Sequence, residues 1–315
     1  MLARLLIVLI ALLPFAATAN KAPAIPDYQA IEVTDGVWVI HGPLSYPSPE
    51  NLGFMNNPAW INTNAGVVIV DPGSSVQVGD MVLRVLRAHT DAPVVAVFNT
   101  HEHGDHWLGN QAIRAAYPDV PIYGHPNMIA KLDAGLGETW TSLMDGMTKG
   151  ATAGTVPVGP NHAVDDGEEI AIGDRHFRIH HKGAAHTHSD IMIDVPEVGV
   201  VFTGDNANNG RLVRLDDGNV KGNIQNLDHA LSLSPKVVVP GHGPSGGQEV
   251  IREYRAYLDA LYTTVAKLYA DGQSDFEMKD AVVTACDHWS GWAGFDDEIG
   301  RNLNRAYLEI EAAAF

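Results

Sequence analysis

Short apolar segments separated by polar or glycine-rich turns dominate the sequence up to about residue 125. The segment 67–70 reads Val-Val-Ile-Val and is followed by Asp-Pro-Gly, which predicts a buried strand closed by a turn. Further strands are predicted at 31–33, 37–41, 59–62, 94–98 and 122–123. Helices are predicted at 76–87 and at about 108–116, one on each side of the strand 94–98. This alternation predicts helices packed on a β-sheet.

The middle of the chain returns to strand patterns, and the tail is helical. Strands are predicted at 169–172, 176–181, 191–195, 198–203 and 237–239, with a short helix near 224–233. Between 250 and 269, apolar residues recur at helical spacing, and Gly272 can end that helix. The stretches 42–58 and 149–160 are rich in Pro, Gly or Thr and are predicted loops within one domain. We expect an α/β domain over 20–247 and a helical extension over 248–315.

The N-terminus has the pattern of a cleaved export signal. Arg4 precedes an apolar run at 5–16, and Ala17-Thr18-Ala19 fits the small-x-small pattern of a signal-peptidase site. An uncleaved anchor helix is the alternative, but the run is shorter than the ~20 apolar residues that a membrane span needs. We expect a signal peptide at 1–19 and an exported protein without a membrane span, periplasmic if the cell is Gram-negative.

Composition narrows the classes of function. Hydrophobic residues make up 45% of the chain and charged residues 18%, which is typical of a globular protein with a sizeable core. The formal net charge of −18 would repel a polyanion, so we expect no nucleic-acid partner. Cys286 is the only cysteine, which rules out an internal disulfide. It lies in a predicted helix and is interpreted as a small buried apolar residue.

The strongest chemical signal is the segment Asn-Thr-His-Glu-His-Gly-Asp-His at 99–106, directly after a predicted strand. If the backbone is still extended at His101 and His103, both side chains share one face and can bind one ion. Gly104 would then permit a sharp turn that presents Asp105 and His106 to a second position. Imidazole and carboxylate groups at this density suit zinc or another first-row transition metal.

Two other interpretations of this segment are weaker. A zincin helix needs His-Glu-x-x-His, but the fourth residue after His101 is Asp105. A polar surface loop is the second alternative, and it would place a dense His/Asp cluster after a buried strand without a ligand to offset its desolvation.

Three further polar loops follow predicted strands, and they contain His186, Asp205 and His242. Each is a weak signal alone, because a histidine near glycines is often only a turn residue. In a layered α/β fold, however, loops at one end of a sheet converge on a site. All four segments together, in this order, are a specific signal for a metal-binding site.

From about residue 37 to 244 the chain resembles the metallo-β-lactamase superfamily. The matching motifs are His-x-His-x-Asp-His at 101–106, His186-Thr187, Thr203-Gly204-Asp205 and Gly241-His242-Gly243. The resemblance implies a four-layer αββα sandwich with a binuclear metal site at one edge. It assigns a first metal to His101, His103 and His186. It assigns a second metal to Asp105, His106 and His242, with Asp205 bridging both ions and Asp71 supporting the ligands.

One departure from the family narrows the resemblance. The true β-lactamases of the superfamily lack the bridging aspartate, so Asp205 places the chain nearer the glyoxalase, lactonase, sulfatase and periplasmic hydrolase branches. Together with the signal peptide, the segment Thr187-His188-Ser189-Asp190 is most similar to exported zinc hydrolases found with quinoprotein and sulfur-oxidation systems.

The implied mechanism is hydrolysis assisted by two metal ions. These are zinc or, alternatively, iron or another first-row metal. The ions lower the pKa of a bridging water, and the hydroxide attacks an ester, thioester, lactone or lactam carbonyl. Asp105 would orient this nucleophile. His188 is a candidate proton donor or oxyanion partner, and an exposed loop histidine is an equally good interpretation.

The expected partner is a small-molecule substrate held between apolar walls at 46–55 and 289–292. An exposed loop with packing aromatic residues is an equally good interpretation of these two segments. Two alternatives stay open. A mononuclear iron sulfur dioxygenase would use the same scaffold and most of the same ligands. A non-enzymatic metal-binding maturation factor would instead bind a periplasmic protein partner.

Overall fold

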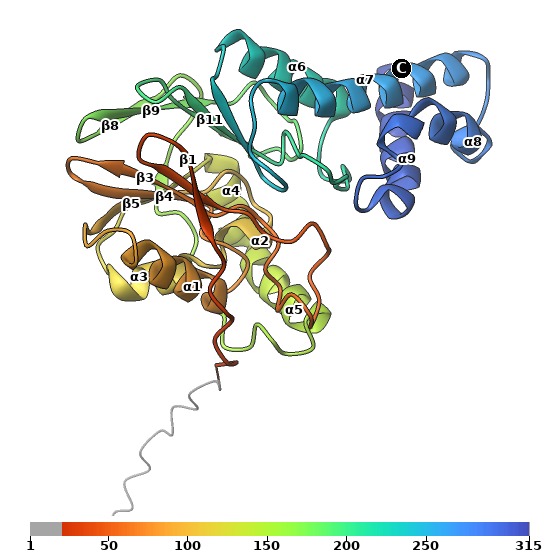
Figure 1. The fold of residues 1–315 in the computed structure, drawn as a ribbon. Helices are drawn as coiled ribbons and strands as arrows, with labels where there is room; N and C mark the ends of the chain where they lie inside the picture. The colour runs from red at the N-terminus through yellow and green to blue at the C-terminus, as the bar shows by residue number, and fades with distance from the viewer. Residues whose placement is uncertain (1–20, 315) are drawn as a thin grey trace, which may run out of the picture.

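Two β-sheets lie face to face between two outer layers of helices (Figure 1). This computed structural model describes residues 21–314, so the predicted signal peptide at 1–19 lies outside the described residues. The layers confirm the predicted αββα architecture, with further helices at the C-terminus. Within the described residues, no helix is long and apolar enough to cross a membrane.

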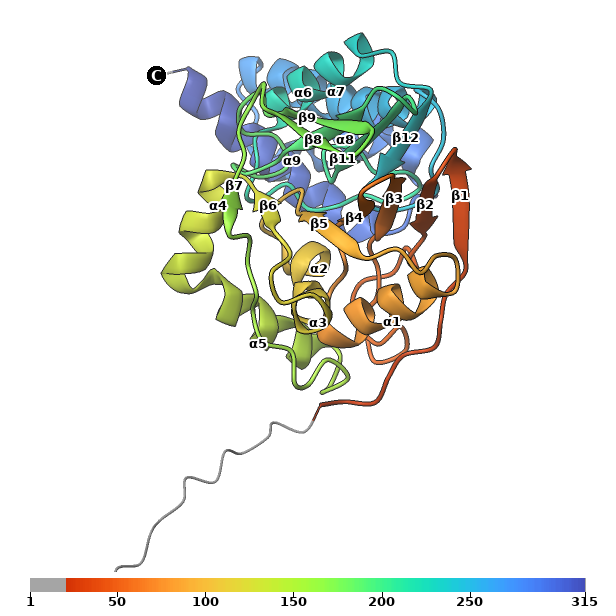
Figure 2. The same ribbon diagram turned by 90° about the vertical axis from the view of Figure 1, so that its left-hand side faces the viewer.

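The first sheet contains seven strands in sequence order. They are β1 (Ala30–Thr34), β2 (Val37–Ile40), β3 (Ala59–Thr63), β4 (Gly66–Val70), β5 (Val94–Phe98), β6 (Ile122–Gly124) and β7 (His162–Ala163). Pairing is antiparallel from β1 to β4 and parallel from β4 to β7. The helices α1 (Val76–Arg87) and α3 (Asn110–Ala116) cover the outer face of this sheet (Figure 2).

The second sheet contains five strands in the order β12-β11-β10-β9-β8. They are β8 (Glu169–Ile172), β9 (Arg175–His180), β10 (Met192–Val195), β11 (Val200–Gly204) and β12 (Val237–Pro240). The strands β11 and β12 are parallel, so their carboxyl ends meet at one edge. The helices α6 (Val220–Ser232) and α7 (Glu249–Ala270) pack on the outer side of this sheet.

The strand β4 is apolar at every position because both of its faces are buried. Its residues are all buried, and they alternate between two hydrophobic clusters. Val67 and Ile69 face α1, whereas Val68 and Val70 face the second sheet. Between the sheets, the ring of Phe98 on β5 stacks on the ring of Phe177 on β9, with centroids 5.3 Å apart. The sandwich therefore holds together through side chains that the sequence pattern marks as apolar.

The helical extension packs on α6 and continues the hydrophobic cluster of the second sheet. It consists of α7, α8 (Asp275–Ala285), a short 3₁₀ turn (Asp287–Trp289) and α9 (Phe295–Ala313). The capping box of Ser274 and Glu277 starts α8. Cys286 ends α8 and is buried, and burial raises the pKa of its thiol to about 12. It packs as an apolar residue.

The helix predicted at about 108–116 is confirmed as α3, and the sequence-based prediction missed the short helix α2 (Gly104–Trp107) before it. No helix was predicted between 126 and 147, where the structure has α4 (Pro126–Lys131), a π-helical turn (Leu132–Leu136) and α5 (Gly137–Met147). Glycines interrupt this region, and Gly135 has a φ of 98° that breaks the helical backbone. That interruption masked the helical periodicity.

The helix α9 fixes the loop after β11 through one buried side chain. The amide nitrogen of Asn302 donates to the carbonyl of Val213 (3.0 Å) and to the hydroxyl of Tyr257 (2.9 Å), and its amide oxygen accepts from the backbone N–H of Leu215 (3.0 Å). We expect N302A to lower the free energy of unfolding by about 3 kcal/mol, because it leaves buried polar groups without partners. Urea unfolding measures this loss.

The control for this prediction is N304A on the same helix. Asn304 is exposed, and its side-chain amide donates to the half-buried Asp275 (2.7 Å). Its removal should change the free energy of unfolding by less than about 0.5 kcal/mol. Equal losses in the two variants would contradict the clamping role of Asn302.

Candidate metal centre

The segment that follows β5 supplies four of the predicted ligands. His101 is fully buried, and His103 has extended backbone angles (φ −72°, ψ 133°) as the residue that precedes α2. Asp105 and His106 lie in the first turn of α2. The change from extended chain to helix therefore sends the two pairs of side chains to two neighbouring positions.

The role of Gly104 differs from the prediction of a sharp turn. Gly104 is the first residue of α2, and it packs against α5. A Cβ at this position would lie 2.8 Å from the Cβ of Trp140. Glycine is needed here because the lack of a side chain lets α2 and α5 approach closely. Its backbone does not adopt a positive φ.

The other three predicted ligands come from the second sheet. His186 lies in the loop between β9 and β10, Asp205 follows β11, and His242 follows β12. All three are at most 3% exposed. Gly241 is required here, because a Cβ would lie 1.9 Å from Oδ1 of Asp205. The centre is therefore built from the facing edges of both sheets.

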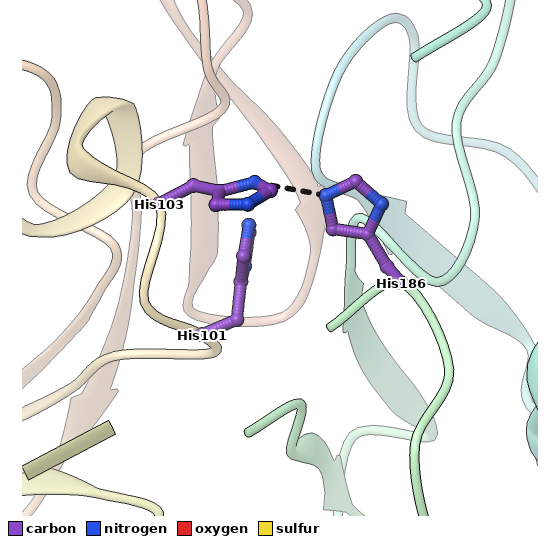
Figure 3. A group of neighbouring side chains, drawn as sticks. All are labelled: His101, His103 and His186. Carbon is purple, nitrogen blue, oxygen red and sulfur yellow. Dashed lines mark hydrogen bonds between the residues drawn. The ribbon is translucent and has the colours of Figure 1, made fainter. Parts of the chain in front are cut away.

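The structure brings all seven predicted ligands together. Within each of three groups, the possible ligand atoms lie within 4.8 Å of one another. The groups are His101, His103 and His186; His101, His106 and Asp205; and Asp105, His106 and His242. In Figure 3 the three rings of the first group point toward a common space, and Nε2 of His186 is 3.0 Å from Nδ1 of His103.

Asp205 lies between the two predicted positions. Its Oδ1 is 3.3 Å from Nε2 of His106, and its Oδ2 is 3.5 Å from Nε2 of His186. The same Oδ2 is 3.3 Å from Nε2 of His242. The carboxylate thus lies within 3.5 Å of imidazoles from both groups, which is the arrangement expected of a bridging ligand.

Unsatisfied buried atoms test whether this cluster fits metal ions. Nε2 of His101, Nε2 of His106 and Oδ1 of Asp205 are buried and have no hydrogen-bond partner among residues 21–314. Such atoms are costly unless another group binds them. Imidazole nitrogens and carboxylate oxygens are ligands of zinc and of other first-row metals. The residues present fit a metal centre.

The outer ring nitrogens of three ligands have partners of their own. Nε2 of His103 lies 3.2 Å from Asp217, Nδ1 of His106 lies 2.8 Å from Asp71, and Nδ1 of His242 lies 2.8 Å from the carbonyl of Met55. Each partner accepts a hydrogen bond from the outer N–H, so the proton stays on the outer nitrogen and the inner nitrogen keeps a free lone pair. These contacts set the tautomers needed for metal binding.

Burial keeps two histidines of the first group neutral. It lowers the pKa of His186 to about 3, and burial with the neighbouring histidines lowers the pKa of His101 well below its ordinary value. Burial opposes ionisation of Asp205, but His242 and His106 outweigh it and hold the pKa of that carboxyl well below its usual range. In return, the neighbouring carboxylates outweigh burial and raise the pKa of both of these histidines. Metal binding at His106 and His242 would therefore displace protons, because only a neutral imidazole is a ligand.

Asp71 has the supporting position that the family resemblance implies. Its Oδ2 accepts from the hydroxyl of Thr100 (2.6 Å) and faces His106, and its Oδ1 accepts from the backbone N–H of Thr100 (2.8 Å). Asp71 has a φ of 50°, an uncommon angle for a residue with a side chain. The structure keeps this strained backbone where the carboxylate orients a ligand.

Asp217 is a supporting residue that the sequence did not reveal. We expect D217A to weaken metal binding by about 10- to 100-fold, because the outer nitrogen of His103 loses its acceptor. Competition with a chromogenic chelator measures the affinity. The control is D216N, since Asp216 is an exposed neighbour that pairs at 3.7 Å with Arg301 instead. Unchanged affinity in D217A would contradict the orienting role.

A cavity of about 150 Å³ opens beside the cluster. One wall is apolar and comes from α5, with Trp140, Leu143, Met144 and Met147. Tyr46 and Met55 from the predicted loop wall also line it. Its polar lining residues are His103, Asp105, His186, Asp205, Arg211, Arg214, His242 and Glu298.

Two parts of the predicted site, His188 and the segment 289–292, do not line the cavity. His188 is exposed and does not line the cavity, and its backbone carbonyl accepts from Asn127 (2.8 Å). The predicted wall at 289–292 is also wrong. Trp289 is buried against Tyr257, and Trp292 stacks with Tyr254, so both rings pack among the C-terminal helices.

Several cavity residues were missed by sequence reasoning. The apolar wall has a signal that was available, because Trp140, Met144 and Met147 follow helical spacing. Arg211 and Arg214 come shortly after Asp205 in an acidic chain, and that position was also readable. Glu298 had no local signal, since it reaches the cavity only through the packing of α9.

A two-sheet αββα sandwich with buried His/Asp groups at the edge between its sheets defines a class of metal-binding proteins. The family model described as "Metallo-beta-lactamase superfamily" matches residues 52–242. The chain belongs to this superfamily, as its motifs predicted.

Curated relatives match over part of their length. Hydroxyacylglutathione hydrolase from Synechococcus sp. (strain JA-3-3Ab) is 29% identical over 169 residues, which is 54% of this chain and 55% of the relative. A probable hydroxyacylglutathione hydrolase from Schizosaccharomyces pombe is 26% identical, covering 62% of this chain and 67% of the relative. The chain spans about half the length of the first of these relatives.

Solved structures share the fold. A metallo-β-lactamase from Pontibacter korlensis aligns with a TM-score of 0.59 at 19% identity, covering 73% of this chain and 98% of that chain. The sec-alkylsulfatase Pisa1 from Pseudomonas sp. aligns with a TM-score of 0.69 at 17% identity, covering 89% of this chain and 50% of that chain. At these identities the likeness concerns the fold.

Proposed function

We propose that the protein is a hydrolase that uses two zinc ions to cleave an ester, thioester, lactone or lactam. The observation that supports this function is the pair of ligand groups that share Asp205 beside a cavity. His101, His103 and His186 would hold one ion. Asp105, His106 and His242 would hold the other. When bound, the ions would supply a water of lowered pKa and Lewis acidity toward a carbonyl oxygen.

Asp105 has the geometry to position a nucleophilic water. Its carboxylate lines the cavity, and its Oδ2 is 3.3 Å from Nε2 of His242. Burial raises its pKa, but His106 and His242 outweigh burial and hold the carboxyl ionised. An ionised carboxylate here accepts a hydrogen bond from the water and takes its proton as the carbonyl is attacked.

The walls of the cavity suggest how a substrate is held. The side chains of Trp140, Leu143 and Met144 offer an apolar surface beside the ligands. An acyl chain on this surface would place its carbonyl near Asp105 and exclude water from the reacting atoms. The hydroxyacylglutathione hydrolases among the relatives are named for thioester substrates, so we place thioesters first among the candidate bonds.

We also propose that the protein is exported. The charged start, the apolar run at 5–16 and the Ala-Thr-Ala segment at 17–19 support a cleaved signal. Expression of the full chain in a Gram-negative host should yield periplasmic protein whose N-terminus is Asn20. Protein that keeps Met1 and stays in the cytoplasm would contradict export.

Metal analysis combined with a hydrolysis screen tests the proposed function. Protein purified without added metal should contain close to two zinc ions per chain and should hydrolyse at least one thioester, ester, lactone or lactam. About one iron per chain with oxygen-dependent activity would instead favour a sulfur dioxygenase. Metal binding without turnover of any such compound would favour a maturation factor that binds a partner protein.

A further inference from the structure

Arg211 is a buried cation without an anionic partner. Its side chain is 3% exposed, and among the described residues no carboxylate forms an ion pair with it. Its Nη1 lies 3.5 Å from the carbonyl of Ser45 and 3.3 Å from Nδ1 of His242. That ring nitrogen also faces the carbonyl of Met55 at 2.8 Å, so its proton goes there. A guanidinium buried in this way favours an anion from outside the chain.

Glu298 is a buried anion in the same cavity. It lies on α9 and is 5% exposed, and its Oε1 accepts from the hydroxyl of Tyr46 (2.6 Å). Its Oε2 is buried without a hydrogen-bond partner. A carboxylate oxygen without a partner is costly, and a donor or cation from a ligand would satisfy it.

Tyr46 connects the two charges. The guanidinium carbon of Arg211 lies 5.1 Å from the centroid of the tyrosine ring, while the hydroxyl of that ring bonds to Glu298. Burial and Glu298 raise the pKa of Tyr46, so its hydroxyl remains a donor. All three residues line the cavity together with the metal ligands. One wall thus carries a cation over the face of this ring and an anion at its hydroxyl.

We propose that Arg211, Tyr46 and Glu298 form a subsite for the zwitterionic, amino-acid-type end of a substrate. Arg211 binds its carboxylate, and Glu298 binds its ammonium group through Oε2. A zwitterion carries no net charge, so it is not repelled by a chain with a net charge of −18. The apolar wall of α5 then takes the rest of the substrate. This assignment rests on the proposed function, because it describes the non-reacting part of the same substrate.

Three thioethers that cannot be hydrolysed test the subsite by calorimetry on the metal-loaded protein. S-Butyl-homocysteine carries both charges, 4-(butylthio)butanoate lacks the amine, and 3-(butylthio)propylamine lacks the carboxylate. The zwitterion should bind at least about tenfold more tightly than either singly charged probe, because each charge contributes a charge-assisted hydrogen bond. Equal affinity for the zwitterion and the butanoate would overturn the assignment of Glu298.

Variants separate recognition from folding. E298Q should lower the affinity for the zwitterion about tenfold and leave that for the butanoate unchanged. R211M should weaken both carboxylate probes. The control D296N removes an exposed charge on the same helix and should bind all probes as the wild type does. If E298Q weakens every probe equally, Glu298 is only structural and the proposal fails.

This test is independent of the proposed hydrolysis. Binding is measured without turnover, whereas a neutral acyl thioester tests the chemistry without the zwitterionic group. Turnover of the neutral thioester with no preference for the zwitterion would overturn the subsite alone. A clear preference for the zwitterion without turnover of any acyl compound would overturn the hydrolase and leave the subsite standing.

Discussion

D105N should lower kcat/KM by about a thousandfold while the protein stays folded. The substitution keeps the shape of the side chain and removes its charge. The carboxylate lines the cavity beside His242. In the proposed mechanism it accepts a hydrogen bond from the water and takes its proton. Loss of a positioned general base typically costs ~10²–10⁴ in rate. Steady-state kinetics on the best substrate of the screen measures this effect.

Metal content must be measured in the same preparation, because Asp105 is also a predicted ligand. With metal supplied in excess, D105N should remain metal-loaded and still turn over slowly. The matched control is D119N, which removes an exposed charge far from the cavity lining. Near-normal turnover in metal-loaded D105N would exclude the proton-accepting role.

Removal of metal should lower the thermal unfolding midpoint by roughly 10 °C. The buried nitrogens of His101 and His106 and one oxygen of Asp205 have no protein partner, so without metal they remain desolvated and unpaired. Ligand binding to the native state alone stabilises it by about 4 kcal/mol at a thousandfold excess over Kd. For a chain of this size that corresponds to the stated shift.

Scanning calorimetry before and after dialysis against a chelator measures the shift. Re-addition of zinc should restore the original midpoint. The same chelator saturated with zinc before use is the control, since it cannot remove metal and should leave the midpoint unchanged. An unchanged midpoint in protein shown to be metal-free would mean that the cluster is satisfied without metal.

Local pattern was sufficient to predict most strands and the candidate ligands, whereas the four-layer sandwich was predicted from the family resemblance. The strand β4 is buried on both faces, and such a strand must be apolar at every position. The ligands follow strand ends, so His101, Asp205 and His242 could be read from short segments next to apolar runs. Both signals lie within a few residues of each other in the sequence.

The walls of the cavity could not be predicted in the same way. Glu298 reaches the cavity because α9 packs on α7, and nothing near residue 298 indicates that contact. The tryptophans at 289 and 292 were assigned to a wall because aromatic residues often bind substrates. The same apolar area fills the contact between α7 and the C-terminal segment instead. Burial alone does not distinguish a core from a cavity lining.

The placement of Asn302 and Glu298 on one helix has a consequence for how this protein can diverge. They lie four residues apart on α9, one holding the loop after β11 and the other lining the cavity. The seven candidate metal ligands all come from before residue 243. A change confined to the last helix would therefore keep every candidate ligand and alter a residue that lines the cavity. Substrate recognition and the metal centre can thus evolve through mutations in different parts of the gene.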